Sequence, residues 1–314
     1  MAKTTKTSSS RKKTASRTVA APTEKPKQSV TRVKVDETKR SAPKLRFNRR
    51  SLAGNGARLN PSRLLAELVG TFVLTLVIVA ALSGKFTLSF FATPEIISQA
   101  VQNGQSIPSF GIMPFVGGLA LAVLVMMTYR ISNGFFNPAV VVGQMVLRRT
   151  QVVEGVGYII AQILGAMLAL TVATRLITVF NAEAGELVAL NPATLFNRTS
   201  DWTVFFAELL GAFVFGLGVA AAMRYAGAVR GAIVGAAFVI AVGVAATAGA
   251  GLLNPALAIG VGMIGFGDGD TWALAGIYLG GSTLGVLVGM GLYTLIARGE
   301  ESTAPVVQKT TETV

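Results

Sequence analysis

Long uninterrupted apolar runs recur along this chain, and polar residues gather between them. Starting at residue 64, each run is about 20 residues long, the length of a helix that crosses roughly 30 Å of hydrocarbon. The runs cover residues 64–82, 113–129, 156–177, 204–223, 233–248 and 272–297. This pattern predicts an all-α membrane protein with six transmembrane helices.

Two further apolar stretches, residues 135–147 and 252–266, are too short to span a bilayer. Each carries the triplet Asn-Pro-Ala near its start. The six triplet residues are Asn137, Pro138, Ala139, Asn254, Pro255 and Ala256. Asparagine favours the N-cap of a helix and proline its first position, so each triplet predicts the start of a short helix. Non-helical backbone at membrane depth is tolerated where it lines a cavity, so we expect two re-entrant half-helices beside a pore or binding site.

The chain also repeats itself. Residues 66–73 and 207–214 share the pattern Ala-Glu-Leu-x-Gly-x-Phe-Val, and each copy precedes one of the two triplets. We assign repeat one to residues 64–180 and repeat two to residues 203–297, within a membrane domain at 63–298. Each repeat has three spans, an odd number, so the second is inverted and the half-helices should meet near the membrane midplane.

The charges between the spans predict the orientation. The connections after spans two and four are basic and those after spans three and five are acidic, and basic connections mark the cytoplasm. The basic residues are Arg130, Arg148, Arg149, Arg224 and Arg230; the acidic ones are Glu183, Glu186, Asp201, Asp268 and Asp270. We expect a multi-pass protein of the cell membrane with both termini cytoplasmic.

Composition adds a basic tail to this picture. The net charge is +13 and the pI about 10.4, although 52% of the 314 residues are hydrophobic. The first 63 residues hold 18 basic and 3 acidic side chains, whereas the rest hold 10 and 12. Residues 1–62 are predicted to be a disordered cytoplasmic tail, and residues 299–314 a short second one. The basic N-terminal tail has three possible roles: attraction to anionic lipid, a plain orientation signal, or nucleic-acid binding. Nucleic-acid binding is disfavoured, because the tail lacks aromatic residues between its basic ones.

Neither cysteine nor histidine occurs in the sequence. Their absence excludes disulfides, metal sites built on Cys or His, and catalysis by a nucleophile paired with His. We therefore predict no enzyme activity, no metal and no cofactor.

Together these motifs resemble the aquaporins, the major intrinsic protein family, over residues 64–297. The paired triplets carry the resemblance, with the two Ala-Glu-x-x-Gly segments and the third-span segment 158–166, in which Gln162 has the family spacing from Asn137. The resemblance implies a homotetramer with one pore per subunit. It also implies that Asn137 and Asn254 donate hydrogen bonds to a passing molecule, and that Glu67 and Glu208 are buried acids accepting hydrogen bonds from loop backbone.

The positions that match the family's outer selectivity filter are Gly117, Val242 and Leu257, with Gly251 or a neighbour as the fourth. Water-selective members have an arginine where Leu257 stands, an aromatic at the Gly117 position and often a histidine at the Val242 position. Glycerol-conducting members usually add an aspartate where this chain has Ala258. We expect a wider, more apolar filter that passes water and small uncharged solutes such as glycerol through the bilayer.

Two other functions remain open. An ion-coupled secondary transporter could use the same inverted repeat, but it would need an ionisable midplane residue besides Glu67 and Glu208. A non-conducting membrane protein of the same fold is compatible with the altered filter. Neither alternative explains the paired triplets as directly as a passive channel does.

Overall fold

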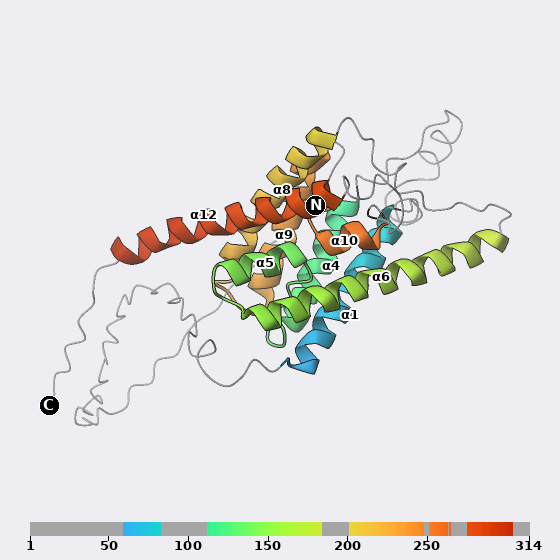
Figure 1. Ribbon diagram of the computed structural model, residues 1–314, viewed down its shortest axis with the longest axis horizontal. Helices are drawn as coiled ribbons and strands as arrows, with labels where there is room; N and C mark the ends of the chain where they lie inside the picture. The colour runs from blue at the N-terminus through green and yellow to red at the C-terminus, as the bar shows by residue number, and fades with distance from the viewer. Residues whose placement is uncertain are drawn as a thin grey trace, which may run out of the picture. The chain divides into compact units, whose positions relative to one another are not determined.

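The computed structural model describes residues 59–82, 112–183, 201–247, 251–262, 264 and 275–303 (Figure 1). All of them belong to the compact unit Leu45–Val314. The basic tail, apart from its last four residues, lies outside the described residues, and so do residues 304–314. The predictions for these tails are therefore not addressed by the structure.

The described residues form helices and no strand, which confirms the all-α class. The elements are α1 (Pro61–Leu82), α4 (Met113–Thr128), α5 (Pro138–Val146), α6 (Val152–Glu183), α8 (Asp201–Ala222), α9 (Gly227–Ala246), α10 (Pro255–Gly260), the π-helix η3 (Gly276–Gly281) and α12 (Ser282–Thr303).

Five helical segments are long and apolar enough to cross a membrane: Pro61–Leu82, Val152–Leu176, Trp202–Ala222, Gly227–Ala246 and Gly276–Arg298. The predicted second span appears as α4, which has 16 residues and is about 24 Å long at 1.5 Å per residue. Within the described residues, the structure therefore has five full-length spans and one shorter apolar helix, rather than six full spans. α10 has six residues, so it is also shorter than the apolar stretch that predicted it.

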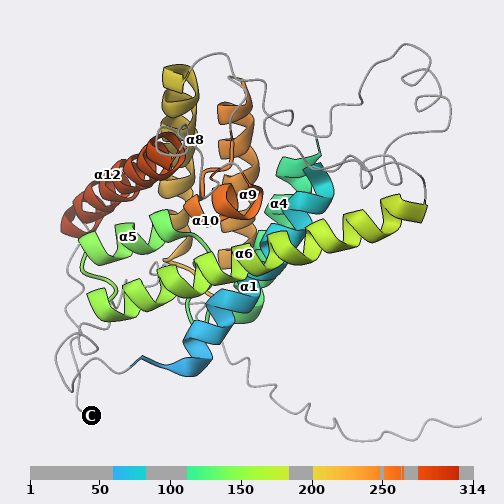
Figure 2. The ribbon, with the colours of Figure 1, turned by 45° about the vertical axis from the view of Figure 1, so that its right-hand side comes forward.

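The helices pair in the same way in both halves of the chain. α1 packs against α6 and α4 in the first half, and α8 packs against α12 and α9 in the second. Each half-helix also contacts the other half, because α5 packs on α12 and α10 packs on α6. Figure 2 shows α5 between α12 and α6, with α10 nearby. This exchange brings the two half-helices into the centre of the helix bundle.

Glycines allow close contacts between helix pairs, because small residues let membrane helices approach each other. A Cβ at Gly165 of α6 would collide with the carbonyl oxygen of Leu68 in α1, and a Cβ at Gly285 of α12 would collide with that of Leu209 in α8. Leu68 and Leu209 directly follow the two repeated glutamates. The close contacts are therefore equivalent in the two repeats.

The π-helix η3 brings α12 against α8 where Glu208 lies. A Cβ at Gly281 would be 2.9 Å from the carbonyl oxygen of Phe205 and 3.3 Å from Cβ of Glu208. The hydroxyl of Ser282 donates a hydrogen bond to the carbonyl oxygen of Tyr278, four residues earlier. Ser282, the first residue of α12, thus contributes a hydroxyl donor where the π-helix ends.

The outward faces of the helices are apolar. On α4, Phe115, Leu119, Val123 and Met127 are exposed at four-residue spacing. A helix that is apolar on its exposed face and its buried face belongs in lipid or in a protein interface, not in water. The exposed stripe therefore agrees with a multi-pass membrane protein.

We predict that Gly285→Ala lowers thermal stability in detergent by about 1–3 kcal/mol, because the added methyl group collides with α8. Gly291→Ala on the same helix is the matched control, since nothing lies within 4 Å of a Cβ built there. Fluorescence-detected size-exclusion after heating measures both variants. Equal midpoints for the two variants would contradict the close contact.

Candidate functional site

Asn137 and Asn254 begin the two half-helices. Both have extended backbone, with φ −151° and ψ 114° at Asn137 and φ −152° and ψ 111° at Asn254. Each side-chain Oδ1 accepts a hydrogen bond from the N–H two residues later, at 2.9 Å from Ala139 and at 2.9 Å from Ala256. Pro138 and Pro255 are the first helical residues. Each triplet thus forms a capped helix start, as predicted.

The two amides also tie the half-helices together reciprocally. Asn137 Nδ2 donates to the carbonyl oxygen of Leu253 at 2.9 Å, and Asn254 Nδ2 donates to that of Phe136 at 2.8 Å. Each asparagine therefore bonds to the residue that precedes the other one. An amide nitrogen carries two hydrogens, and no second acceptor is seen for either of them among the described residues. One N–H of each asparagine remains for another molecule.

Phe136 and Leu253 have the left-handed backbone that makes these bonds possible. Their φ angles are 48° and 52°, which is unfavourable for side chains with a Cβ. Such strain persists only where the surroundings hold it. Here the N–H of each residue is held by a glutamate and its carbonyl by an asparagine, so the strained residue sits between two fixed hydrogen bonds.

Glu67 and Glu208 are the glutamates that hold them. Glu208 accepts hydrogen bonds at 2.8 Å from the backbone N–H groups of Gly251, Leu252 and Leu253. Both carboxylates have no exposed surface. A buried carboxylate is costly unless its oxygens are hydrogen-bonded, so each glutamate fixes the loop before a triplet.

Glu67 accepts hydrogen bonds from two side chains as well as from its loop backbone. It accepts from the N–H of Phe135 at 3.0 Å and of Phe136 at 2.8 Å, and from the Ser132 hydroxyl at 2.6 Å. Gln162 of α6 donates the fourth hydrogen bond, at 2.8 Å. The first repeat therefore uses two side chains where the second uses a backbone N–H.

The repeated Ala-Glu-x-x-Gly segment has a direct structural reason. Gly70 and Gly211 lie three residues after the glutamates, one helical turn further on. A Cβ at Gly70 would overlap the Phe136 ring, and one at Gly211 would be 2.7 Å from Cδ2 of Leu253. The glutamate thus holds the N–H of the strained residue, and the glycine makes room for its side chain.

The four filter positions are all buried. Gly251 supplies an N–H to Glu208, with φ 138°, and Leu257 N–H is 3.4 Å from Asn254 Oδ1. A Cβ at Gly117 would be 2.5 Å from Cδ1 of Ile78 and 2.9 Å from Cε1 of Phe238. These two side chains therefore lie close to the Gly117 backbone, on the side where a side chain would stand.

Sequence reasoning did not single out Phe238, which lies against Gly117, or Arg230, which lines a pocket described below, as candidate site residues. They lie on α9 with Val234 and Val242 at four-residue intervals, and all four are buried. Residues four apart share a helix face, so this spacing, counted back from Val242, is the signal that could have found them. The Phe238 ring also packs edge-on against Phe215 of α8, at 5.9 Å between centroids.

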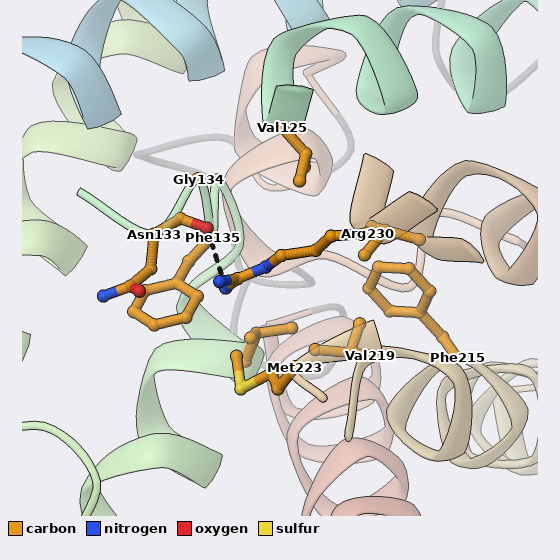
Figure 3. A pocket seen from close by; sticks show the side chains of 10 residues that line it. Val125, Asn133, Gly134, Phe135, Phe215, Val219, Met223 and Arg230 are labelled. Atoms are coloured by element: carbon orange, nitrogen blue, oxygen red, sulfur yellow. Dashed lines mark hydrogen bonds between the residues drawn. The ribbon is translucent and has the colours of Figure 1, made fainter. Parts of the chain in front are cut away.

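A small pocket opens beside the first half-helix, between α8 and α9 (Figure 3). Its cavity volume is about 10 Å³, enough for about one water molecule. The pocket is lined by Val125, Asn133, Gly134, Phe135, Val140, Phe215, Val219, Met223, Arg230 and Val234. Phe135 precedes the first triplet by two residues and Val140 directly follows it, so the pocket lies beside the start of α5. No cluster of acidic side chains able to hold a metal ion occurs within the described residues.

Comparison with protein-family models shows to which family the chain belongs. The family model described as "Major intrinsic protein" matches residues 61–293. The chain belongs to the major intrinsic protein family. Membership confirms the predicted passive membrane channel for water and small solutes and the absence of an enzyme function.

Relatives of this major intrinsic protein include channels of plants and bacteria. Aquaporin NIP3-1 of Zea mays is 30% identical over 72% of each chain. Aquaporin NIP3-1 of Oryza sativa subsp. japonica is 29% identical over 70% of this chain and 67% of its own. "Glycerol uptake facilitator protein-like 6" of Lactiplantibacillus plantarum is 33% identical over 42% of this chain and 56% of its own.

A solved structure agrees with the fold. The aquaglyceroporin of Plasmodium falciparum matches with a TM-score of 0.57, covering 77% of this chain and 99% of that one. The sequence identity is 18%, so this likeness concerns the fold alone. The all-helical major intrinsic protein fold is therefore supported by sequence and by structure.

We predict that Glu208→Gln lowers the water permeability of reconstituted protein at least tenfold. An amide has one oxygen in place of two, and its NH₂ group would face a backbone N–H donor of the loop. Stopped-flow light scattering at equal protein content measures the effect. Glu154→Gln, at the start of α6, is the control and should keep permeability; unchanged permeability in Glu208→Gln would contradict the role of the carboxylate.

Proposed function

We propose that water and small uncharged solutes pass between the starts of α5 and α10, and that Asn137 and Asn254 bind the molecule in transit. The reciprocal amide bonds carry this proposal, since they fix both side chains and leave one N–H on each. Water and polyol oxygens accept such hydrogen bonds as neutral molecules. Two half-helix starts also present partial positive charge, which disfavours cations.

The same hydrogen bonds oppose proton transfer. In a pore, water molecules pass one behind another. A water molecule whose oxygen accepts hydrogen bonds from both asparagines cannot also accept a hydrogen bond that relays a proton from the neighbouring water molecule. The chain of waters is then interrupted at the triplets. The two fixed N–H donors are sufficient for this interruption, and an arginine in the filter is not needed.

For the selectivity of the channel, we propose that Phe238 acts together with Gly117, Val242, Gly251 and Leu257. Phe238 lies against Gly117 and one helical turn from Val242, so its ring narrows the region where the family's span-two aromatic would stand. The lining is apolar, in keeping with solutes that carry hydrocarbon as well as hydroxyl groups. Glycerol is the proposed larger solute, and a bacterial relative is named a glycerol uptake facilitator protein-like protein.

An ion-coupled transporter is less well supported. Glu67 and Glu208 accept four and three hydrogen bonds, respectively, so both carboxylates are committed to the loops. A carboxylate that carries an ion or proton must be able to release these bonds. A non-conducting protein remains the alternative that permeability measurements exclude directly.

The assembly and orientation remain predictions from the sequence and the family resemblance. We propose a homotetramer with both termini cytoplasmic and with the basic tail on anionic lipid; nucleic acid is not a proposed partner. The exposed apolar side chains of α4 suit either lipid or a neighbouring subunit.

The channel function predicts that proteoliposomes shrink faster than empty liposomes under an osmotic gradient. Asn254→Met should remove most of this water permeability, because it removes the cap of α10 and the bond to Phe136 together. Stopped-flow light scattering measures both proteins. Wild-type vesicles no faster than empty ones would support the non-conducting alternative.

The selectivity proposal predicts that Phe238→Ala raises glycerol permeability severalfold relative to water, since it removes a ring from the narrow region. Phe206→Ala is the matched control, because Phe206 is 60% exposed on the outside of α8. Glycerol-gradient and sucrose-gradient stopped-flow give the two permeabilities. An unchanged ratio in Phe238→Ala would show that the ring does not limit the solute.

A further inference from the structure

Arg230 is buried without a counter-charge. Its side chain is 9% exposed, and the pocket beside the first half-helix is lined partly by this residue. The guanidinium Nη2 donates to the carbonyl oxygen of Asn133 at 3.1 Å, as Figure 3 shows. No carboxylate pairs with it among the described residues, where the ion pair found joins Arg63 to Glu154.

The remaining donors of Arg230 need acceptors. A guanidinium has five N–H donors, and burying a charge is costly unless those donors are hydrogen-bonded. The other walls of the pocket near it are apolar, including Phe215, Val219 and Met223. Oxygen atoms of water or solute inside the pocket can supply the missing acceptors. Arg230 is thus placed to bind the molecules that occupy this cavity.

The position of Arg230 relates it to the altered filter. Arg230 and Val242 both lie on the broad buried side of α9, about 18 Å apart along the helix axis at 1.5 Å per residue. Val242 is on the part of α9 that holds a predicted filter position. Leu257, another of these positions, stands where water-selective members of the family have an arginine. Arg230 marks the opposite end of α9, near the arginine-bearing connections α4–α5 and α8–α9.

Other arginines in or beside the interhelical connections near Arg230 have partners outside the pocket. Arg149 bonds to Thr294 of α12 at 3.0 Å, and burial, followed by the nearby charge of Arg298, lowers the pKa of Arg149. Arg224 faces the Tyr293 hydroxyl at 3.4 Å. Arg130 is exposed and lies over the Tyr129 ring. Of these residues, Arg230 is the one that lines the pocket.

We infer that Arg230 is a selectivity residue of the channel: its guanidinium binds permeant oxygen atoms in the pocket and repels cations there, supplying the positive charge that Leu257 lacks. Charges interact strongly where water is scarce, so one guanidinium beside a water-sized cavity is an effective cation barrier. A neutral water molecule is attracted instead. This inference rests on the proposed channel function and adds a second selective region to it.

The test measures water permeability and potassium leak in the same proteoliposomes, by stopped-flow and by a potassium-dependent voltage dye. Arg230→Gln removes the charge and keeps a donor for the Asn133 carbonyl. Met223→Glu neutralises the charge while Arg230 stays in place, because Met223 lines the same pocket. We expect both variants to leak potassium at least tenfold faster than wild type, and the water permeability of the same vesicles shows that each variant folds and conducts.

Two controls separate the possible outcomes. Arg230→Lys keeps the charge, so its potassium leak should be as low as that of wild type. Arg130→Met removes one exposed charge from a neighbouring connection and should also leak potassium as slowly as wild type. A neutralising variant that folds and conducts water yet leaks no more than wild type would overturn the inference. A wild-type protein that leaks as much as the variants would also overturn it, whereas wild type without water permeability refutes the channel function itself.

Discussion

Two carboxylates buried in the membrane region organise the centre of this protein. Glu67 and Glu208 have no exposed surface, and their oxygens accept hydrogen bonds from the loop N–H groups of residues 135–136 and 251–253. These bonds hold Phe136 and Leu253 in left-handed backbone, which points their carbonyl oxygens at the opposite asparagines. The Asn137 and Asn254 amides are therefore positioned by a chain of satisfied hydrogen bonds that starts at the glutamates.

Much of this arrangement can be predicted from residue patterns. Apolar run length predicts the helices, the Asn-Pro pairs predict where α5 and α10 begin, and the repeated Ala-Glu-x-x-Gly segments predict an inverted pair. The reason for the glycine is invisible in sequence, because it depends on the strained conformation of Phe136 and Leu253. The run of residues 113–129 predicts α4 to within one residue, whereas the apolar stretch 252–266 predicts a longer half-helix than the six residues of α10.

The predicted filter positions show what position matching leaves out. At Gly117, the side chains of Ile78 and Phe238 from neighbouring helices lie where a Cβ would be built. Such neighbours are distant in sequence, so only the packing reveals them. Arg230 was assigned by its charge to a cytoplasmic connection, yet it is buried on the same broad side of α9 as Phe238 and Val242. This side of the helix thus carries a charge near one end and apolar groups toward the other.

The absence of native cysteine allows that face to be tested residue by residue. Val242→Cys places a thiol on the inner face of α9, and Ile240→Cys places one on the outer face, where Ile240 is 60% exposed. Water permeability of each variant is measured before and after a small mercurial reagent. If water passes along the inner face, the reagent blocks Val242→Cys and leaves Ile240→Cys unaffected; block of Ile240→Cys with Val242→Cys modified but still conducting would place the pathway elsewhere.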